Sequence, residues 1–124
     1  MDRETFEGLV SEALASLPEL FLEKLENVEI DVEEWPSNAD LEAAGLSPEE
    51  GAHLLGLYHG VPLTERGVYY MALPDRISIY RLPIELVAGS DPERIKEQVR
   101  RTVIHEVAHY YGISDERLWE LGWG

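Results

Sequence analysis

The segment His105-Glu106-Val107-Ala108-His109 constrains this chain more than any other feature, because it lies inside a long stretch with helical periodicity. Two histidines four residues apart on a helix lie one turn above each other, so their ring nitrogens can approach a single metal ion. Glu106 lies beside them, where a carboxylate can accept and return protons. The rest of the chain must therefore supply the support for such a site.

The helix that carries this segment has clear start and stop signals. Ser90 or Asp91 can cap its first turn, Pro92 suits the first helical position, and Glu93 suits the first turn. Gly112 can adopt the left-handed conformation that ends many helices. We therefore expect one helix from about Pro92 to Tyr111.

On this helix the possible ligands and the core-facing residues occupy different arcs. At about 100° per residue, His109 lies about 40° from His105, and Glu106 lies about 100° from it. The arc between about 160° and 300° holds the residues expected to face the core, namely Val103, Ile104, Val107, Ala108 and Tyr111. One side of the helix is thus expected to pack while the other presents the histidines.

The H-E-x-x-H pattern is typical of zinc hydrolases, in which a third protein ligand and a water complete the coordination of zinc. The chain contains no cysteine, so the third ligand should be an acid in the short tail: Asp115, Glu116 or Glu120. Asp115 is the first choice, because a reversal at Gly112 can return its carboxylate to the imidazoles. Glu120 is the reserve. Asp115 could instead serve only as a first-turn acid of a terminal helix that begins at Ser114.

Upstream segments indicate a mixture of helices and strands. Apolar residues at helical spacing predict an N-terminal helix from about Phe6 to Leu17, ended by Pro18, and alternation predicts a half-buried strand at Val28–Glu33. Before and after that strand we expect a short turn of helix at Glu19–Leu25 and turns with one helical turn at 34–50. A strand or buried helical turn is expected at Leu54–Gly60, followed by a loop at Gly60–Gly67. Two strands, Val68–Leu73 and Arg76–Leu82, should be joined at Pro74-Asp75, and a brief helix at Pro83–Val87 should end at Gly89.

These elements predict an α+β fold in a single domain that spans residues 1–124. A small mixed β-sheet should pack against the N-terminal helix and against the C-terminal helix that carries His105 and His109. A chain of 124 residues can bury its own core without disulfides or a structural metal.

Charge and composition restrict the partners. The chain has 25 acidic residues against 10 Lys and Arg, a formal net charge of −15, which disfavours nucleic acids and anionic membranes and favours cations or basic peptides. The acidic start and the lack of a long apolar run predict no signal peptide and no membrane span. Together with the lack of cysteine, this fits a cytoplasmic protein. Nothing in the sequence indicates an oligomeric state.

Three segments together resemble a known family. The stretch from His105 to Arg117, with the upstream segments Leu57–Arg66 and Leu73–Ile77, is similar to the bacterial metallopeptidase-like "minimal zincin" family of small single-domain proteins. The resemblance extends from near Leu54 to the C-terminus. It implies a zincin-like core, His105, His109 and Asp115 as zinc ligands, and Glu106 as the general base.

The same motif also resembles the metzincin pattern H-E-x-x-H-x-x-G-x-x-H/D. Metzincins need a methionine turn after the motif, whereas both methionines here, Met1 and Met71, precede it. This departure separates the chain from the metzincins and leaves the metal ligands unaffected.

The expected function is zinc-dependent peptide hydrolysis, in which Glu106 assists the attack of a zinc-bound water on a peptide or protein substrate. Arg76–Leu82 is the strand expected to align that substrate. Tyr80, Tyr110, Tyr111 and His59 could donate to an oxyanion, but each is better explained as a packing or surface residue. The alternative is a zinc-holding module that binds a peptide or carboxylate without turnover. A three-histidine endonuclease is disfavoured by Glu106, where such enzymes have Gly, and by the negative charge.

Overall fold

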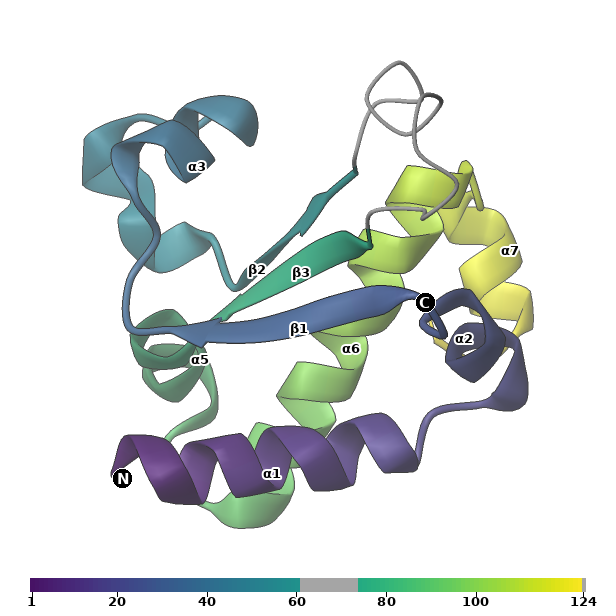
Figure 1. Cartoon of the computed structure of the whole chain (residues 1–124), viewed down its shortest axis with the longest axis horizontal. Coiled ribbons are helices and arrows are strands. Elements are labelled where there is room, and N and C mark those ends of the chain that lie inside the picture. Colours follow the sequence, from purple (N-terminus) through teal and green to yellow (C-terminus); the bar gives the residue numbers. More distant parts are fainter. Residues whose placement is uncertain (61–73, 124) are drawn as a thin grey trace.

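A computed structural model describes residues 1–60 and 74–123 of the chain (Figure 1). The expected strand at Val68–Leu73 and nearly all of the expected loop before it lie outside these residues. In the described part, a small sheet is surrounded by helices, and the fold is α+β as predicted. None of the described helices is both long and apolar enough to cross a bilayer.

The sheet contains β1 (Val28–Glu33), β2 (Gly56–His59) and β3 (Asp75–Tyr80) in the order β1-β3-β2. β1 pairs with β3 in parallel, and β2 pairs with β3 antiparallel, so the sheet is mixed as predicted. The prediction that Arg76–Leu82 aligns a substrate is wrong, because β3 is the middle strand and both of its edges are already paired. β2 is the strand that packs beside the C-terminal helix.

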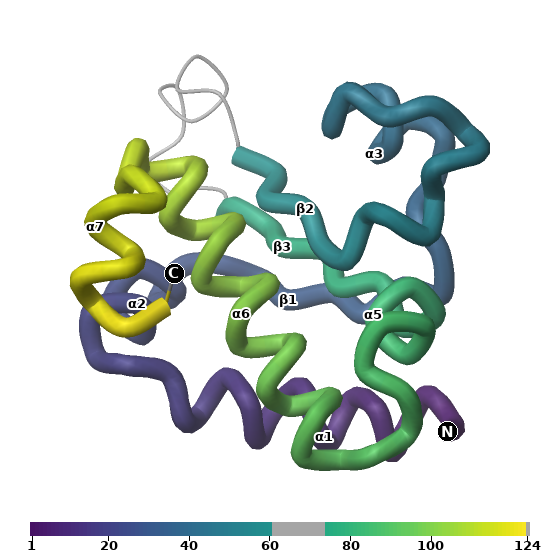
Figure 2. Tube along the Cα trace, turned by 180° about the vertical axis from the view of Figure 1, so that it is seen from behind, coloured from purple at the N-terminus to yellow at the C-terminus, as the bar shows by residue number. Residues whose placement is uncertain are grey.

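Two long helices enclose the main core with the sheet. They are α1 (Arg3–Ala15) and α6 (Pro92–Tyr111), and the second crosses one face of the sheet, as the view from behind shows (Figure 2). The core combines the buried face of α1 with that of α6 and with Ile77 and Ile79 of β3. Burial of these faces removes apolar surface from water, which is the main force that holds such a fold together.

The bounds of α6 are those predicted from its caps. The Asp91 side chain accepts a hydrogen bond from the backbone N–H of Glu93 at 3.0 Å, and Gly112 has φ of 71° at the other end. Val103, Ile104, Val107 and Ala108 are fully buried as expected. The prediction for Tyr111 is wrong: its side chain is 47% exposed, and the Lys24 ammonium lies 4.2 Å from its ring centre. Tyr111 lies beside α2, at the edge of the buried face of α6.

The shorter helices are α2 (Glu19–Lys24), α3 (Asn38–Ala43), the 3₁₀ helix η1 (Pro48–His53), α5 (Arg81–Ala88) and α7 (Asp115–Glu120). Residues 34–50 hold more helix than predicted, because Ser37 and Ser47 cap α3 and η1 in a stretch without apolar periodicity. The predicted end of the strand Arg76–Leu82 is also wrong: β3 ends at Tyr80, and Arg81 and Leu82 begin α5.

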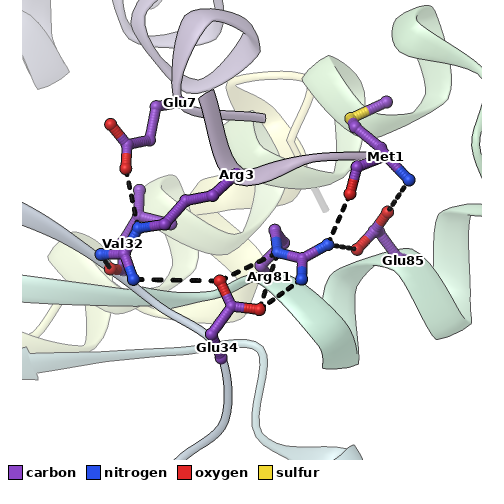
Figure 3. A network of polar contacts seen from close by, with 7 residues as sticks. All are labelled: Met1, Arg3, Glu7, Val32, Glu34, Arg81 and Glu85. Atoms are coloured by element: carbon purple, nitrogen blue, oxygen red, sulfur yellow. Dashed lines mark hydrogen bonds and ion pairs between the residues drawn. The ribbon is translucent and has the colours of Figure 1, made fainter. Parts of the chain in front are cut away.

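At the start of α5, the Arg81 side chain joins three segments (Figure 3). Its guanidinium donates to Glu34 after β1, to Glu85 one turn along α5 at 2.7 Å, and to the Met1 carbonyl oxygen at 2.7 Å. The hydrogen bond from Arg81 lowers the pKa of Glu34. Arg3 of α1 adds a hydrogen bond to the Val32 carbonyl. This network ties the starts of α1 and α5 to the end of β1.

Close packing between β2 and α6 predicts that Gly56→Ala destabilises the protein. An added Cβ would lie 2.7 Å from Cγ2 of Thr102 and 3.1 Å from the Ser78 carbonyl oxygen, and the second atom belongs to the backbone of the central strand β3, which cannot turn away as a side chain can. We expect a loss of about 1–3 kcal/mol in the free energy of unfolding, measured by urea denaturation.

Gly8→Ala is the matched control, because Gly8 lies inside α1 with nothing within 4 Å of the new Cβ. It should stabilise the protein by about 0.5–1 kcal/mol. Equal effects of the two substitutions would contradict the proposed contact between β2 and α6.

Candidate metal centre

His105 and His109 lie on the exposed side of α6, opposite its buried face. The two residues line one pocket of about 240 Å³, together with Glu106 and Asp115. The apolar part of its lining comes from Ala108, Ile113 and Leu118. The structure therefore brings the four residues predicted for the site to a single pocket.

Asp115 reaches this pocket because the chain reverses after α6. Gly112 takes the left-handed conformation, and the backbone N–H of Ile113 donates to the Ala108 carbonyl oxygen at 2.8 Å. The Ser114 side chain then caps α7 by accepting from the backbone N–H of Arg117 at 3.1 Å. Asp115 is thus the first residue of α7, where its carboxylate also suits the positive end of the helix.

The other two acids considered as ligands do not line this pocket. The lining includes neither Glu116 nor Glu120. Glu120 instead accepts from Nη1 of Arg117 at 3.0 Å, one turn back on α7. Of the three candidates in the tail, the structure places Asp115 beside the histidines.

Glu106 lies at the boundary between the exposed and buried sides of α6. Its Oε1 accepts a hydrogen bond from the backbone N–H of Tyr58 in β2 at 3.1 Å. Burial raises the pKa of the Glu106 carboxyl, and the hydrogen bond from Tyr58 opposes that rise only in part. A carboxyl with a raised pKa is a better proton acceptor than an ordinary surface glutamate.

A backbone contact at His105 was not predicted from the sequence. Its Nε2 lies 3.1 Å from the carbonyl oxygen of Trp123. Since a carbonyl can only accept, Nε2 is the protonated nitrogen in this arrangement. Trp123 is held in place because its backbone N–H donates to the Leu118 carbonyl oxygen at 2.8 Å and its side chain packs against the core.

The donor set fits zinc in its chemistry, but the side chains are not arranged around an ion. Two imidazoles and one carboxylate are ordinary ligands of a catalytic zinc. Within residues 1–60 and 74–123, however, no three His, Asp or Glu side chains lie close enough together to hold one ion. Coordination by His105, His109 and Asp115 therefore requires these side chains to turn from the positions described.

Aromatic rings border the site on the side of β2. Tyr110 stacks on Tyr58 with ring centres 4.0 Å apart, and the Tyr58 hydroxyl donates to Asp75 at 2.6 Å. Tyr80 is buried in a separate cluster, where its hydroxyl donates to Asp40 at 2.6 Å. The side-chain positions of Tyr58 and Tyr80 are therefore explained by packing and by hydrogen bonds within the fold.

Comparison with known proteins identifies a family. A family model described as "Zincin-like metallopeptidase" matches residues 25–123, which include β1, β2, β3 and the whole candidate site. A search of curated proteins finds no match to the chain.

Asp115→Asn should weaken zinc binding. Mutation of a residue that only hydrogen-bonds to a metal ligand already lowers metal affinity about 10–100-fold. For a ligand itself we therefore expect at least a tenfold rise in the zinc dissociation constant, measured by competition with a chromogenic chelator.

The control is Glu116→Gln, which removes one charge from the same first turn of α7 without altering the pocket lining. It should leave zinc affinity within about twofold, since a first-turn charge acts mainly on helix stability. Equal losses in the two variants would exclude a special role for Asp115.

Proposed function

The chain belongs to the zincin-like metallopeptidase family, and we propose that it is a zinc-dependent peptidase with His105, His109 and Asp115 as ligands and Glu106 as the general base. The observation that carries the proposal is the single pocket lined by these four residues. Peptide hydrolysis needs a group that activates water and a base that moves its proton, and this pocket holds residues suited to both tasks.

The metal would be held by the two imidazoles and the Asp115 carboxylate. Zinc, when bound, supplies a Lewis acid that activates water and polarises a peptide carbonyl. Glu106 takes the proton from the attacking water and delivers it to the leaving amine. Its position supports this role, because the backbone of β2 holds one carboxylate oxygen at 3.1 Å while the residue remains on the pocket wall.

We place the peptide beside β2, on the side where Glu106 lies. The Tyr80 N–H donates to the Leu55 carbonyl oxygen at 3.0 Å. In an antiparallel pair only every second residue directs its backbone N–H and C=O toward the partner strand, so on this segment every second residue counted from Leu55 faces β3. Tyr58 belongs to the other set, and its N–H points away from β3 toward Glu106. An extended peptide along this side would present its backbone next to the base.

The Glu106→Gln variant tests hydrolysis against simple binding. We expect it to lose at least about a hundredfold of the peptidase activity, because an amide cannot take a proton from water. Zinc content should remain that of the unchanged protein, since Glu106 is not a proposed ligand. Activity is measured on a quenched-fluorescent peptide mixture, and zinc by elemental analysis of the same samples.

His59→Ala is a useful control, because the His59 ring is bound to Ser78 at 3.1 Å and does not line the pocket. It should keep both zinc and activity. Retained cleavage in Glu106→Gln would disprove the role of the base, and zinc uptake without cleavage by the unchanged protein would favour a zinc-holding binding module.

A further inference from the structure

A second pocket, of about 270 Å³, adjoins the candidate metal centre along α6. It shares His105 and Glu106 with the first pocket and extends from them toward the N-terminus of the helix. Residues 53–56, which lead into β2, form one wall, and Gln98, Arg101 and Thr102 of α6 form the other. Its volume suits one side chain or chain end of a bound peptide. We call it the Arg101 pocket.

Strand and helix are closely packed at the floor of the Arg101 pocket. Gly56 and Thr102 meet so closely that a Cβ on Gly56 would lie 2.7 Å from the threonine methyl group. Nε2 of Gln98 donates to the Thr102 hydroxyl at 3.3 Å, which holds the amide on the wall. The pocket is therefore a depression shaped by packed side chains, with polar groups on one side.

The described lining of the Arg101 pocket lacks the excess of acid found in the whole chain. Arg101 and His53 line it, and Glu106, at the end nearest the metal centre, is the acid among its described lining residues. The chain as a whole carries a net charge of −15. One guanidinium and one carboxylate balance each other in this lining, so it does not repel an anionic group as a net-acidic surface does.

The Arg101 guanidinium is positioned by its own helix. Its Nε donates to Oε1 of Glu97 at 3.1 Å, one turn back along α6. A guanidinium has five N–H donors in a planar fork, and this bond uses the Nε–H. The side chain is 43% exposed, so its terminal nitrogens can be reached by a carboxylate.

The distance from the metal centre corresponds to a short stretch of peptide. Arg101 precedes His105 by one turn, which is about 6 Å along the helix axis. An extended peptide covers about that length in two residues. A peptide that lies along this side of α6 could therefore occupy both sites at once.

We propose that the Arg101 pocket binds a carboxylate of the peptide within about two residues of the bond presented to the metal centre. This inference rests on the proposed peptidase function and names the substrate class of that site. The carboxylate can be an acidic side chain or the C-terminus of the peptide, since either makes the same charge-assisted hydrogen bonds with arginine.

Four fluorescent peptides test this proposal. They share a glycine–alanine backbone and carry either Glu or Gln at the central position and either a free carboxylate or a carboxamide at the C-terminus. Binding is measured by fluorescence anisotropy to zinc-loaded Glu106→Gln protein, with and without Arg101→Gln. Without turnover, the affinities report binding alone.

We expect peptides with a carboxylate to lose about tenfold in affinity on Arg101→Gln, the size of a charge-assisted hydrogen bond at a partly exposed site. The peptide with Gln and a carboxamide should change less than twofold. A loss confined to the free C-terminus identifies chain-end recognition, and a loss confined to the central Glu identifies side-chain recognition. Either result supports the proposal.

Arg100→Gln is the matched control. Arg100 also pairs with Glu97, but its Nη1 donates to the hydroxyl of Ser16, the residue that ends α1, at 2.9 Å, away from the pocket. It should leave all four affinities unchanged. Equal losses for both variants, equal losses for all four peptides, or no binding of any peptide would overturn the proposal.

Cleavage by the unchanged protein separates this inference from the proposed function. Hydrolysis with no preference for a carboxylate would overturn the Arg101 pocket alone. An Arg101-dependent preference in binding, with no hydrolysis by the zinc-loaded unchanged protein, would instead overturn the peptidase assignment and leave the pocket as a carboxylate-binding site.

Discussion

Burial of one face of α6 is the constraint on which the site depends. Val103, Ile104, Val107 and Ala108 are fully buried against the sheet and the N-terminal helices. Each large apolar side chain contributes about 1.5–3 kcal/mol when it leaves water, so rotation of α6 about its axis would expose several of them at once. With 3.6 residues per turn, the exposed side of the helix then has to carry His105 and His109.

Glu106, the proposed general base, is placed by contacts between segments far apart in the sequence. Glu106 lies between the two faces of α6, and its partner Tyr58 is 48 residues earlier in the chain. Because β2 packs against this boundary, the carboxylate is partly removed from water and its pKa is raised. The same packing that stabilises the fold therefore adjusts the chemistry of the base, and any change that moves β2 away from α6 acts on both.

The parts of the structure that depend on local sequence could be predicted. Asp91, Pro92 and Gly112 determined the bounds of α6, and the alternation at Val28–Glu33 determined β1. The order of the strands could not be predicted, because pairing of β3 on both sides depends on contacts between distant segments. The contact of His105 with the Trp123 carbonyl was also missed, since a backbone acceptor has no residue type that marks it.

The charge of the chain acts on a peptide at two distances. The net charge of −15 attracts cationic segments during approach, but salt screens such a field beyond about 8–10 Å. At contact, the groups nearest the peptide decide its position, and on one side of the proposed metal centre these would include Arg101. A peptide with a basic segment and a carboxylate near the bond to be cut satisfies both conditions, because the two charges interact with different parts of the protein surface. Overall acidity and local recognition of a carboxylate are therefore compatible in one small protein.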